Sequence, residues 1–380
     1  DKQKLTIMHI DADNKRFQDF IEETEKKLDM EITVEKCPSN ADNRQAKIST
    51  ILASGDKNID LISVNDEMIS EFKHKGYLEP LEKNVMTEEV RDSFPQKYLE
   101  SICEENGHIY SVPFQMDIMM FWVNQELLKQ AGLDEIKNTG DFDILQKSLK
   151  NPDQYAYGDA WENTYVYNSL SQFVNFWGGD YFDWTDPKTK DAARYMKSML
   201  DEKNTSPAQF VDQYEQMEEK FIRGKYGCVF MYTSALGTFL DADVYGKNKI
   251  HMAPLPVLHK KKATNIATWQ YVLNNASENK DAAVRFLQYA AGYEGSTEYA
   301  KIMKSYPARV DVIENEDIDL EGIDMIRKYL REYTLNARPL CENSMGAVSD
   351  MGKLFQGYVL GQCEEDSFFE QAQNCINTYY

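Results

Sequence analysis

The chain has 380 residues, a length that suits two domains, and its 42% hydrophobic and 28% charged residues are typical of a globular protein. Its formal net charge of −21 repels phosphate backbones and anionic lipid surfaces, so we expect no nucleic acid or membrane surface among its partners. The longest run without a charged residue, 163–179, is too short and too polar to span a bilayer, which predicts a soluble chain.

The first third of the chain alternates short apolar runs with amphipathic stretches. Strands are predicted at 5–10, 31–37 and 59–64, with helices between them, the second of which ends at Gly55. Such alternation predicts an α/β fold with a parallel sheet flanked by helices. Ligands of these sheets bind beyond the carboxyl ends of the strands.

Polar clusters follow all three predicted strands, at 11–14, 39–40 and 65–66. Their Asp and Asn side chains are placed to meet a ligand at the edge of the sheet. The same residue types also form turns and cap helices, so both interpretations stay open.

Further along the chain, two extended apolar runs at 109–114 and 118–123 are joined through 115–117. A helical, aromatic-rich region follows, and extended segments return near 250–276. We expect two lobes that exchange the chain at hinge crossings near 114–118, 262–267 and 309–313. The N-terminal lobe would comprise 1–114 plus 267–309, and the C-terminal lobe 118–262 plus 313–380.

Signatures of catalysis and metal binding are absent from the sequence. It contains no HExxH, Walker, GxSxG or GxGxxG motif, and its five histidines are scattered. The six cysteines form no CxxC pair and are interpreted as small buried or idle thiols, although Cys341, Cys363 and Cys375 could include one disulfide. We therefore expect no catalytic residue, no metal and no cofactor.

Seven segments occur in a characteristic order along nearly the whole chain. They are KISTILASGDKNIDLISVND, HKGYLEPLEK, NGHIYSVPFQMDIMMFWVNQELLKQAGL, FWGGDYF, MEEKFIRGKYGCVFMYTSA, MAPLPVL and NNASENKDAAVRFLQYAAGYEG. Together they resemble the family 1 extracellular solute-binding proteins of ABC importers, which include the maltose-binding type. Two departures are Trp269, where the family commonly has Gly, and Gln125, where it has Lys.

The resemblance implies a two-lobed, type II periplasmic-binding-protein fold with a multi-strand hinge. It also implies capture of a carbohydrate, an oligosaccharide, between closing lobes, and delivery to the permease subunits of an ABC importer. The expected setting is extracellular, as a cell-surface lipoprotein or in the periplasm, and the expected state is a monomer.

Aromatic residues are abundant, with 23 Tyr, 18 Phe and 5 Trp, and a sugar ring packs its C–H face on an aromatic plane. Trp161 and Trp269 have polar neighbours and are candidates for such stacking. Trp122 and Trp177 lie in apolar runs and are predicted to be core residues, whereas Trp184 is expected in a surface loop.

The candidate ligand-binding residues share a place at a strand end, at a crossing or at a position suggested by the resemblance. They are Asp13, Asn14, Asn40, Arg44, Asn65, Asp66, Asp117, Trp161, Tyr232, Trp269, Tyr271, Arg309 and Glu342. Arg338 lies near Glu342, before a C-terminal helix that borders the ligand in the maltose-binding type.

Three alternatives remain. The acidic charge and the strand-end carboxylates favour a binder of a cation such as a polyamine, whose binding would depend steeply on salt. A carbohydrate-active enzyme would release product, but no acid–base pair stands out. A receptor that reports its ligand to a signalling partner would need the same closing cleft as a transport receptor.

Overall fold

The computed structural model describes all 380 residues and divides them into two compact units. The first unit comprises Asp1–Met116 and Ala267–Ile323. The second comprises Asp117–Ile266 and Asp324–Tyr380. Each unit is therefore assembled from two separate stretches of chain, and each has its own strands and its own helices.

Two of the three divisions fall inside strands. The first lies within β6 (Val112–Asn124) and the second within β10 (Ala263–Leu273). The sequence predicted two extended runs around 115–117, but β6 is one continuous strand of 13 residues. Its polar residues there alternate with buried ones, which is the period of a strand and not a break in it.

The third division lies at the start of α15 (Ile323–Glu332), later than the crossing near 309–313 that the sequence predicted. The segment before it packs on the first unit. The backbone N–H of Val310 donates to Ser93 O at 2.8 Å, and Tyr306 donates its hydroxyl proton to the carbonyl of Glu321. These bonds hold the segment in the first unit until α15 begins.

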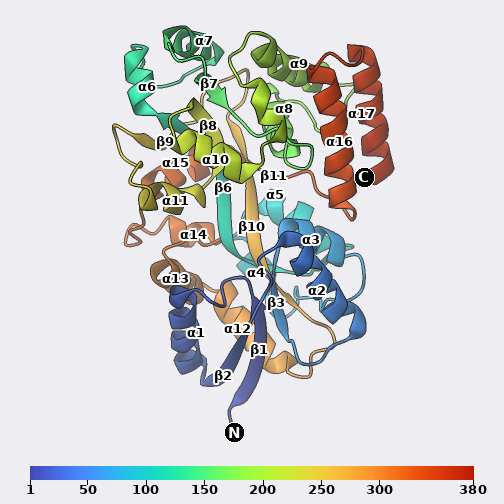
Figure 1. Cartoon of the computed structure of the whole chain (residues 1–380). Coiled ribbons are helices and arrows are strands. Elements are labelled where there is room, and N and C mark those ends of the chain that lie inside the picture. Colours follow the sequence, from blue (N-terminus) through green and yellow to red (C-terminus); the bar gives the residue numbers. More distant parts are fainter. The chain divides into compact units, whose positions relative to one another are not determined.

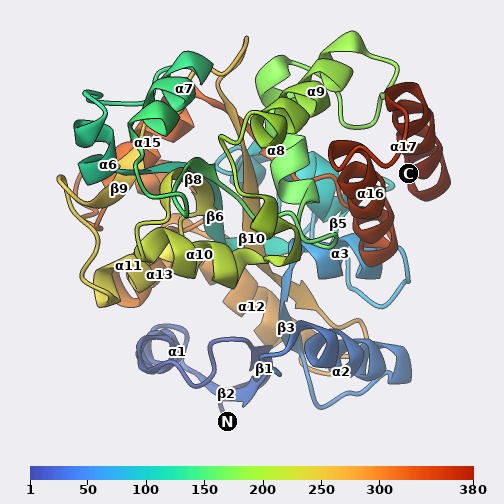
Figure 2. The ribbon, with the colours of Figure 1, turned by 45° about the horizontal axis from the view of Figure 1, so that its top comes forward.

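The sheet of the first unit has the order β2-β1-β3-β10. Strand β1 (Gln3–His9) is parallel to β2 (Met30–Lys36) and to β3 (Leu61–Asn65), and β10 is antiparallel to β3. Because the connection β1–β2 runs one way across the sheet and β2–β3 runs back, right-handed crossovers place their helices on opposite faces. Figures 1 and 2 show α1 (Lys15–Leu28) and α2 (Ala41–Ser54) in those positions.

The remaining elements of the first unit are short connectors and the helices after β10. They are α3 (Asp66–Phe72), α4 (Glu88–Arg91), α5 (Gln96–Tyr98), a π-helical turn (Leu99–Cys103), β4 (Glu104–Glu105), β5 (His108–Ile109), α12 (Lys280–Ala291), α13 (Tyr293–Met303) and α14 (Val310–Ile313).

In the second unit, β6 pairs antiparallel with β8 (Tyr226–Tyr232) and with β9 (Ile250–Ala253). Strand β7 (Tyr155–Gly158) lies parallel to β8, and β11 (Thr334–Ala337) lies parallel to the first residues of β10.

Helices cover this second sheet, and α16 and α17 lie side by side in both ribbon views (Figures 1 and 2). Besides α15, they are α6 (Gln125–Gln130), α7 (Thr139–Ser148), α8 (Tyr167–Trp177), α9 (Pro187–Asp201), a 3-10 turn (Pro207–Val211), α10 (Tyr214–Ile222), α11 (Ala235–Asp241), α16 (Ser344–Val359) and α17 (Glu365–Tyr379).

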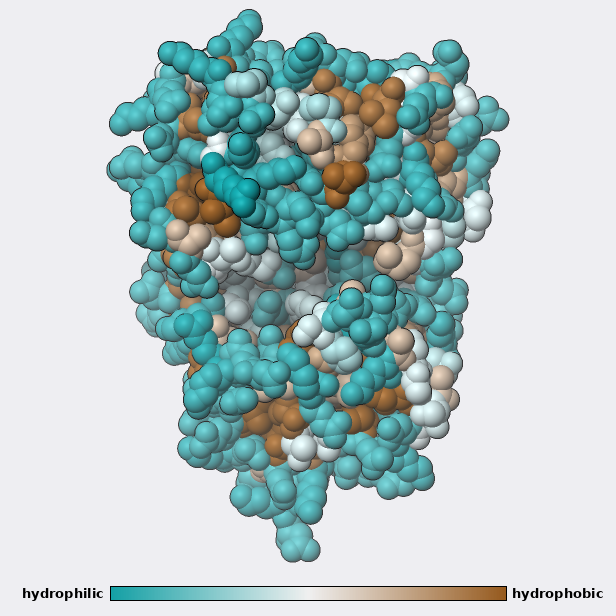
Figure 3. All heavy atoms as spheres, viewed as in Figure 1, coloured by the Kyte–Doolittle hydropathy of each residue, from teal (hydrophilic) through white to brown (hydrophobic).

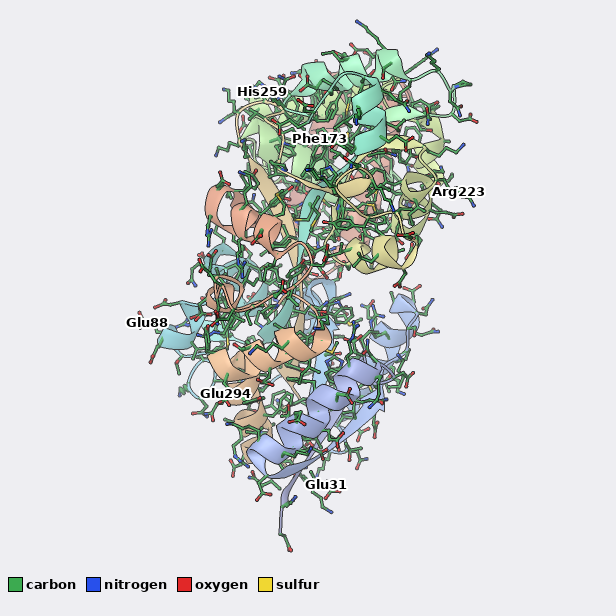
Figure 4. The ribbon with its side chains drawn as sticks, turned by 90° about the vertical axis from the view of Figure 1, so that its left-hand side faces the viewer. Glu31, Glu88, Phe173, Arg223, His259 and Glu294 are labelled. Carbon is green, nitrogen blue, oxygen red and sulfur yellow. The ribbon has the colours of Figure 1, made fainter.

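Aromatic rings fill the core of the second unit. Phe173 lies inside it, against Trp177 and other rings, whereas Arg223 lies at its edge (Figure 4). Trp122 and Trp177 are buried, which confirms the prediction that they are core residues. The prediction for Trp184 is wrong: it is buried against the rings of α17, which lie about 180 residues further along the chain.

The surface is polar in keeping with the composition. The face seen in Figure 3 is mostly hydrophilic, with isolated apolar patches. None of the helices combines the length and the apolar character that a membrane crossing would require.

Candidate ligand-binding residues

The parallel strands of the first unit end together. β1, β2 and β3 end at His9, Lys36 and Asn65, so the segments that follow them leave the same edge of the sheet. Trp269, in the neighbouring strand β10, is paired with Asn65. The sheet thus gathers most of the candidates of this unit at one edge, where ligands of such sheets bind.

Three of the asparagines at this edge cap helices. The side-chain oxygen of Asn14 accepts from Arg16 N at 2.9 Å, that of Asn40 from Asn43 N at 3.0 Å, and that of Asn65 from Met68 N at 3.1 Å. These oxygens satisfy N–H groups that have no partner within a helix. Only the amide N–H groups of the three side chains are left to donate to a ligand.

The two candidate aspartates of the first unit lie in different surroundings. Asp13 is exposed and forms a 3.5 Å ion pair with Lys36, which also donates to the carbonyl of Ile10. Asp66, the first residue of α3, is fully buried. Asp13 therefore presents a solvated carboxylate, whereas Asp66 is part of the packed end of β3.

Arg44 and Trp269 form a contact between helix α2 and strand β10. The Arg44 guanidinium carbon lies 5.4 Å from the centre of the Trp269 ring, a cation–π geometry. Nη1 of Arg44 donates to the carbonyls of Ser39 at 3.0 Å and Pro38 at 3.4 Å, and its Nε is buried without a partner. Trp269 stays half-buried, so part of its ring is open to solvent.

Two residues of the first unit that the sequence predicts as ligand contacts have other roles in the structure. Tyr271 is buried, with its ring stacked on Phe114 at 4.2 Å, and belongs to the core. Arg309 donates to both carboxylate oxygens of Asp311, to Ala291 O and to Ser93 Oγ, so each of its guanidinium nitrogens is already engaged. Its role is to fix the segment before α14.

His9, which the sequence analysis did not select, anchors the loop after β1. Its ring is buried and stacked on Phe17 at 3.9 Å, and its Nδ1 accepts from the backbone N–H of Asp11 at 3.0 Å. Burial lowers the pKa of His9 to about 3, and it raises the pKa of Asp11. His9 is therefore neutral at physiological pH and holds the first strand-end loop in place.

The second unit gathers four tyrosines and one arginine. Tyr232, the last residue of β8, donates its hydroxyl proton to Asn168 Oδ1 at 2.7 Å. Tyr214, at the start of α10, donates to the carbonyl of Tyr232 at 3.3 Å, and its ring centre lies 6.4 Å from that of Tyr232 and 6.2 Å from that of Tyr165. The hydroxyl of Tyr165 is buried and has no hydrogen-bond partner.

Arg338, just after β11, completes this group. Its Nη1 donates to the hydroxyl of Tyr167 at 2.8 Å, and its guanidinium lies 5.8 Å from the Tyr167 ring centre and 5.9 Å from that of Tyr232. We call Tyr165, Tyr167, Tyr214, Tyr232 and Arg338 the tyrosine cluster. Of these residues, Tyr232 and Arg338 are predicted from the sequence, and the YVYN stretch at 165–168 is a signal for two of the others.

The remaining candidates of the second unit differ in their surroundings. Asp117, in β6, accepts from Thr233 Oγ1 at 3.1 Å, and Glu342 is exposed in the turn before α16. Trp161 is a correction: its ring is wholly buried against Phe355 and Phe210, so it belongs to the core.

The side chains described above are suited to binding a small molecule. Rings with hydroxyl, amide and guanidinium groups at their edges supply flat contact area and directional hydrogen bonds, which are the properties of a small-molecule site.

Known proteins resemble this chain in sequence. The sequence pattern of bacterial extracellular solute-binding proteins matches residues 11–297. A probable amino-acid ABC transporter periplasmic-binding protein of Sinorhizobium fredii is 24% identical over 242 residues, 60% of this chain and 54% of the relative. The chain thus spans about half the length of the curated relatives that it matches.

Solved structures match over nearly the whole chain. The sugar-binding protein MalE from Xanthomonas citri has a TM-score of 0.83 and 16% identity, and covers 99% of this chain and 96% of its own. The GacH receptor of Streptomyces glaucescens, solved unliganded and with acarbose, has a TM-score of 0.79, 18% identity and full coverage of both chains. These likenesses confirm the predicted two-lobed fold, and with the match over 11–297 they show that the chain belongs to the bacterial extracellular solute-binding proteins.

Proposed function

We propose that this protein captures a carbohydrate, an oligosaccharide, and delivers it to the membrane subunits of an ABC importer. The observation that carries the proposal is the tyrosine cluster, in which four rings and a guanidinium from separate elements converge. A sugar ring would pack on a tyrosine plane, and its hydroxyls would bond to groups such as the unpartnered Tyr165 hydroxyl.

In the proposed mechanism, the strand-end edge of the first unit and the tyrosine cluster of the second bind one solute. The solute stabilises a closed state by contacting both units, and the extended crossings at β6 and β10 act as the hinge. The importer recognises that closed state outside the membrane, where the protein is held by a lipid anchor or confined to the periplasm. No bond of the solute is broken.

Two kinds of relative support different solutes. The sugar-binding MalE and acarbose-binding GacH structures favour a saccharide, whereas the Sinorhizobium fredii relative is named an amino-acid binder. Because the identities are low, we weigh the residues more heavily, and the tyrosine cluster favours a saccharide.

Calorimetry with purified protein tests the proposal. Neutral mono-, di- and trisaccharides, amino acids and polyamines are titrated separately, and we expect the tightest binding from a saccharide longer than one ring. Binding of an amino acid or a polyamine with no heat from any saccharide would refute the proposal. Chromatography of the recovered sugar provides the check on catalysis, because a binding protein returns it intact.

A further inference from the structure

Arg44 is a buried arginine with no carboxylate partner. Arg309 pairs with Asp311 at 2.7 Å, and Arg194 pairs with Glu365 at 3.0 Å. Arg44 is 6% exposed, yet it makes no ion pair, and its only hydrogen bonds go to two backbone carbonyls. A buried guanidinium is normally paired, because the uncompensated charge is costly away from water.

The unused donors of Arg44 lie on one edge of the guanidinium. Both of its bonds use Nη1, so neither Nε nor Nη2 has a partner in the chain, and Nε is buried. The Nε–Nη2 edge presents two parallel N–H groups, the geometry that a carboxylate accepts with both oxygens. A neutral hydroxyl would satisfy only one of these donors and would leave the charge uncompensated.

The surroundings of Arg44 carry charges of both signs, because Asp42 and Glu67 lie near it together with two lysines. Lys36, Lys47 and Arg44 lie close enough to act together on the thiol of Cys37, and Arg44 itself lies in the first turns of α2, near its N-terminus. Burial lowers the pKa of Arg44, while Cys37 and Glu67 oppose that shift. An anion bound here would gain mainly from Arg44 and from the N-terminus of α2, because Lys36 is already paired with Asp13 and Lys47 is exposed to solvent.

Arg44 also lies at the edge where the strands end. Its two carbonyl partners belong to the loop after β2, and its guanidinium covers part of Trp269, whose strand position is opposite Asn65. A solute ring resting on the open part of Trp269 would therefore bring a substituent within reach of the guanidinium.

We infer that the solute is an acidic saccharide, whose carboxylate pairs with the Nε–Nη2 edge of Arg44 while a ring of the sugar packs on Trp269. The inference rests on the proposed function and makes it more specific, since it names the class of sugar. Amino acids carry the same carboxylate chemistry, and the experiment separates the two sources.

The experiment measures affinity by calorimetry for matched pairs: galacturonic acid against galactose and glucuronic acid against glucose, each as monosaccharide and trisaccharide. Amino acids form a further arm. We expect an acidic trisaccharide to bind at least 10-fold more tightly than its neutral counterpart, with an affinity that falls as sodium chloride is added. Arg44→Gln should abolish that preference, so that the acidic and the neutral trisaccharide bind with equal affinity.

Two variants control the test. Lys47→Gln removes an exposed charge from the same helix and should keep the preference, and Arg44→Lys should retain only part of it because lysine lacks the two-pronged edge. Thermal melting confirms that each variant is folded; if Arg44→Gln is unfolded, the comparison rests on Arg44→Lys.

The outcomes separate the two claims. Neutral sugars that bind as tightly as acidic ones, with Arg44→Gln affecting both equally, would overturn the inference and leave the proposed function intact. Binding of amino acids but of no saccharide would overturn both the acidic-saccharide inference and the proposed function, whether or not it depends on Arg44.

Discussion

Trp161 donates its indole N–H to the carboxylate of Asp159 at 3.0 Å, deep in the core of the second unit. The same carboxylate accepts from Tyr157 at 2.6 Å, from Ser169 at 2.6 Å and from the backbone of Ala160 at 2.8 Å. One buried acid thus joins β7, the loop that follows it and α8. Burial raises the pKa of Asp159, while the four donors work in the opposite direction.

Replacing this acid should weaken the second unit. Asp159→Asn puts an amide N–H₂ against groups that are themselves donors, so we expect the free energy of unfolding to fall by about 2–4 kcal/mol. Urea denaturation followed by fluorescence measures the change. Asp153→Asn, at an exposed position, is the control and should stay within about 0.5 kcal/mol of the wild type. An equal effect of the two substitutions would contradict the role of Asp159.

His9 should make stability depend on pH. Its pKa is about 3 in the folded chain and about 6.5 in an unfolded one, so the unfolded state binds a proton first as the pH falls. The stabilisation is complete above pH 6.5 and is lost progressively between pH 6.5 and about 3. At pH 5 we expect a loss of about 2 kcal/mol relative to pH 7.5.

Urea midpoints at several pH values test this expectation for the wild type and for His9→Phe, which keeps a ring against Phe17. The variant should be less stable at pH 7.5 but should lose less on acidification. His259→Phe, at an exposed position, is the matched control and should show the acid sensitivity of the wild type. A slope in His9→Phe identical to that of the wild type would rule His9 out as the cause.

Substitutions of two tyrosines of the second unit should affect different properties, one the affinity for a saccharide and the other the stability of the fold. The Tyr165 hydroxyl has no partner in the chain, so Tyr165→Phe should leave stability nearly unchanged and weaken saccharide binding by about 0.5–1.5 kcal/mol, roughly 2- to 10-fold. Tyr157→Phe removes a bond to buried Asp159 and should do the reverse, lowering stability by about 1–3 kcal/mol with little effect on affinity. Calorimetry and thermal melting of both variants provide the readouts.

Replacement of two glycines of α16 by alanine should change the free energy of unfolding in opposite directions. A Cβ on Gly352 would lie 1.9 Å from the carbonyl oxygen of Asn163, so Gly352→Ala must push the helix away from that loop and should cost more than about 2 kcal/mol. Gly357 has no atom nearer than 4.0 Å, and Gly357→Ala should stabilise the helix by about 0.5–1 kcal/mol. Denaturation midpoints of the two variants decide this, and destabilisation of both would show that the space around Gly357 is misjudged.

The sequence predicts the fold well where a helix or strand is determined by the residues of one short stretch. The structure confirms the predicted alternation of strands and helices in the first third of the chain. It also confirms that α2 ends at Gly55, which adopts the left-handed conformation with φ of 66°. The sequence predicts two runs in place of the continuous strand β6, because Gln115 and Asp117 are polar. In the structure these two residues alternate with buried neighbours, as they do in any strand with one exposed face.

The candidate site was predicted less well because burial depends on partners that are distant in the sequence. Trp161 has polar neighbours along the chain, but its ring is covered by Phe355, nearly 200 residues away. Tyr271 is covered in the same way by Phe114. Conversely, Tyr165, Tyr214 and Tyr232 come from three separate elements, and no local pattern joins them.

The interrupted course of the chain also governs how the protein is made. Strand β3, buried in the finished sheet, needs β10 beside it, and residues 117–266 must be synthesised between the two. At about 5–20 residues per second this interval lasts about 8 to 30 s on the ribosome. Throughout that time the edge of β3 has no partner strand, and an unpaired apolar edge of this kind favours aggregation.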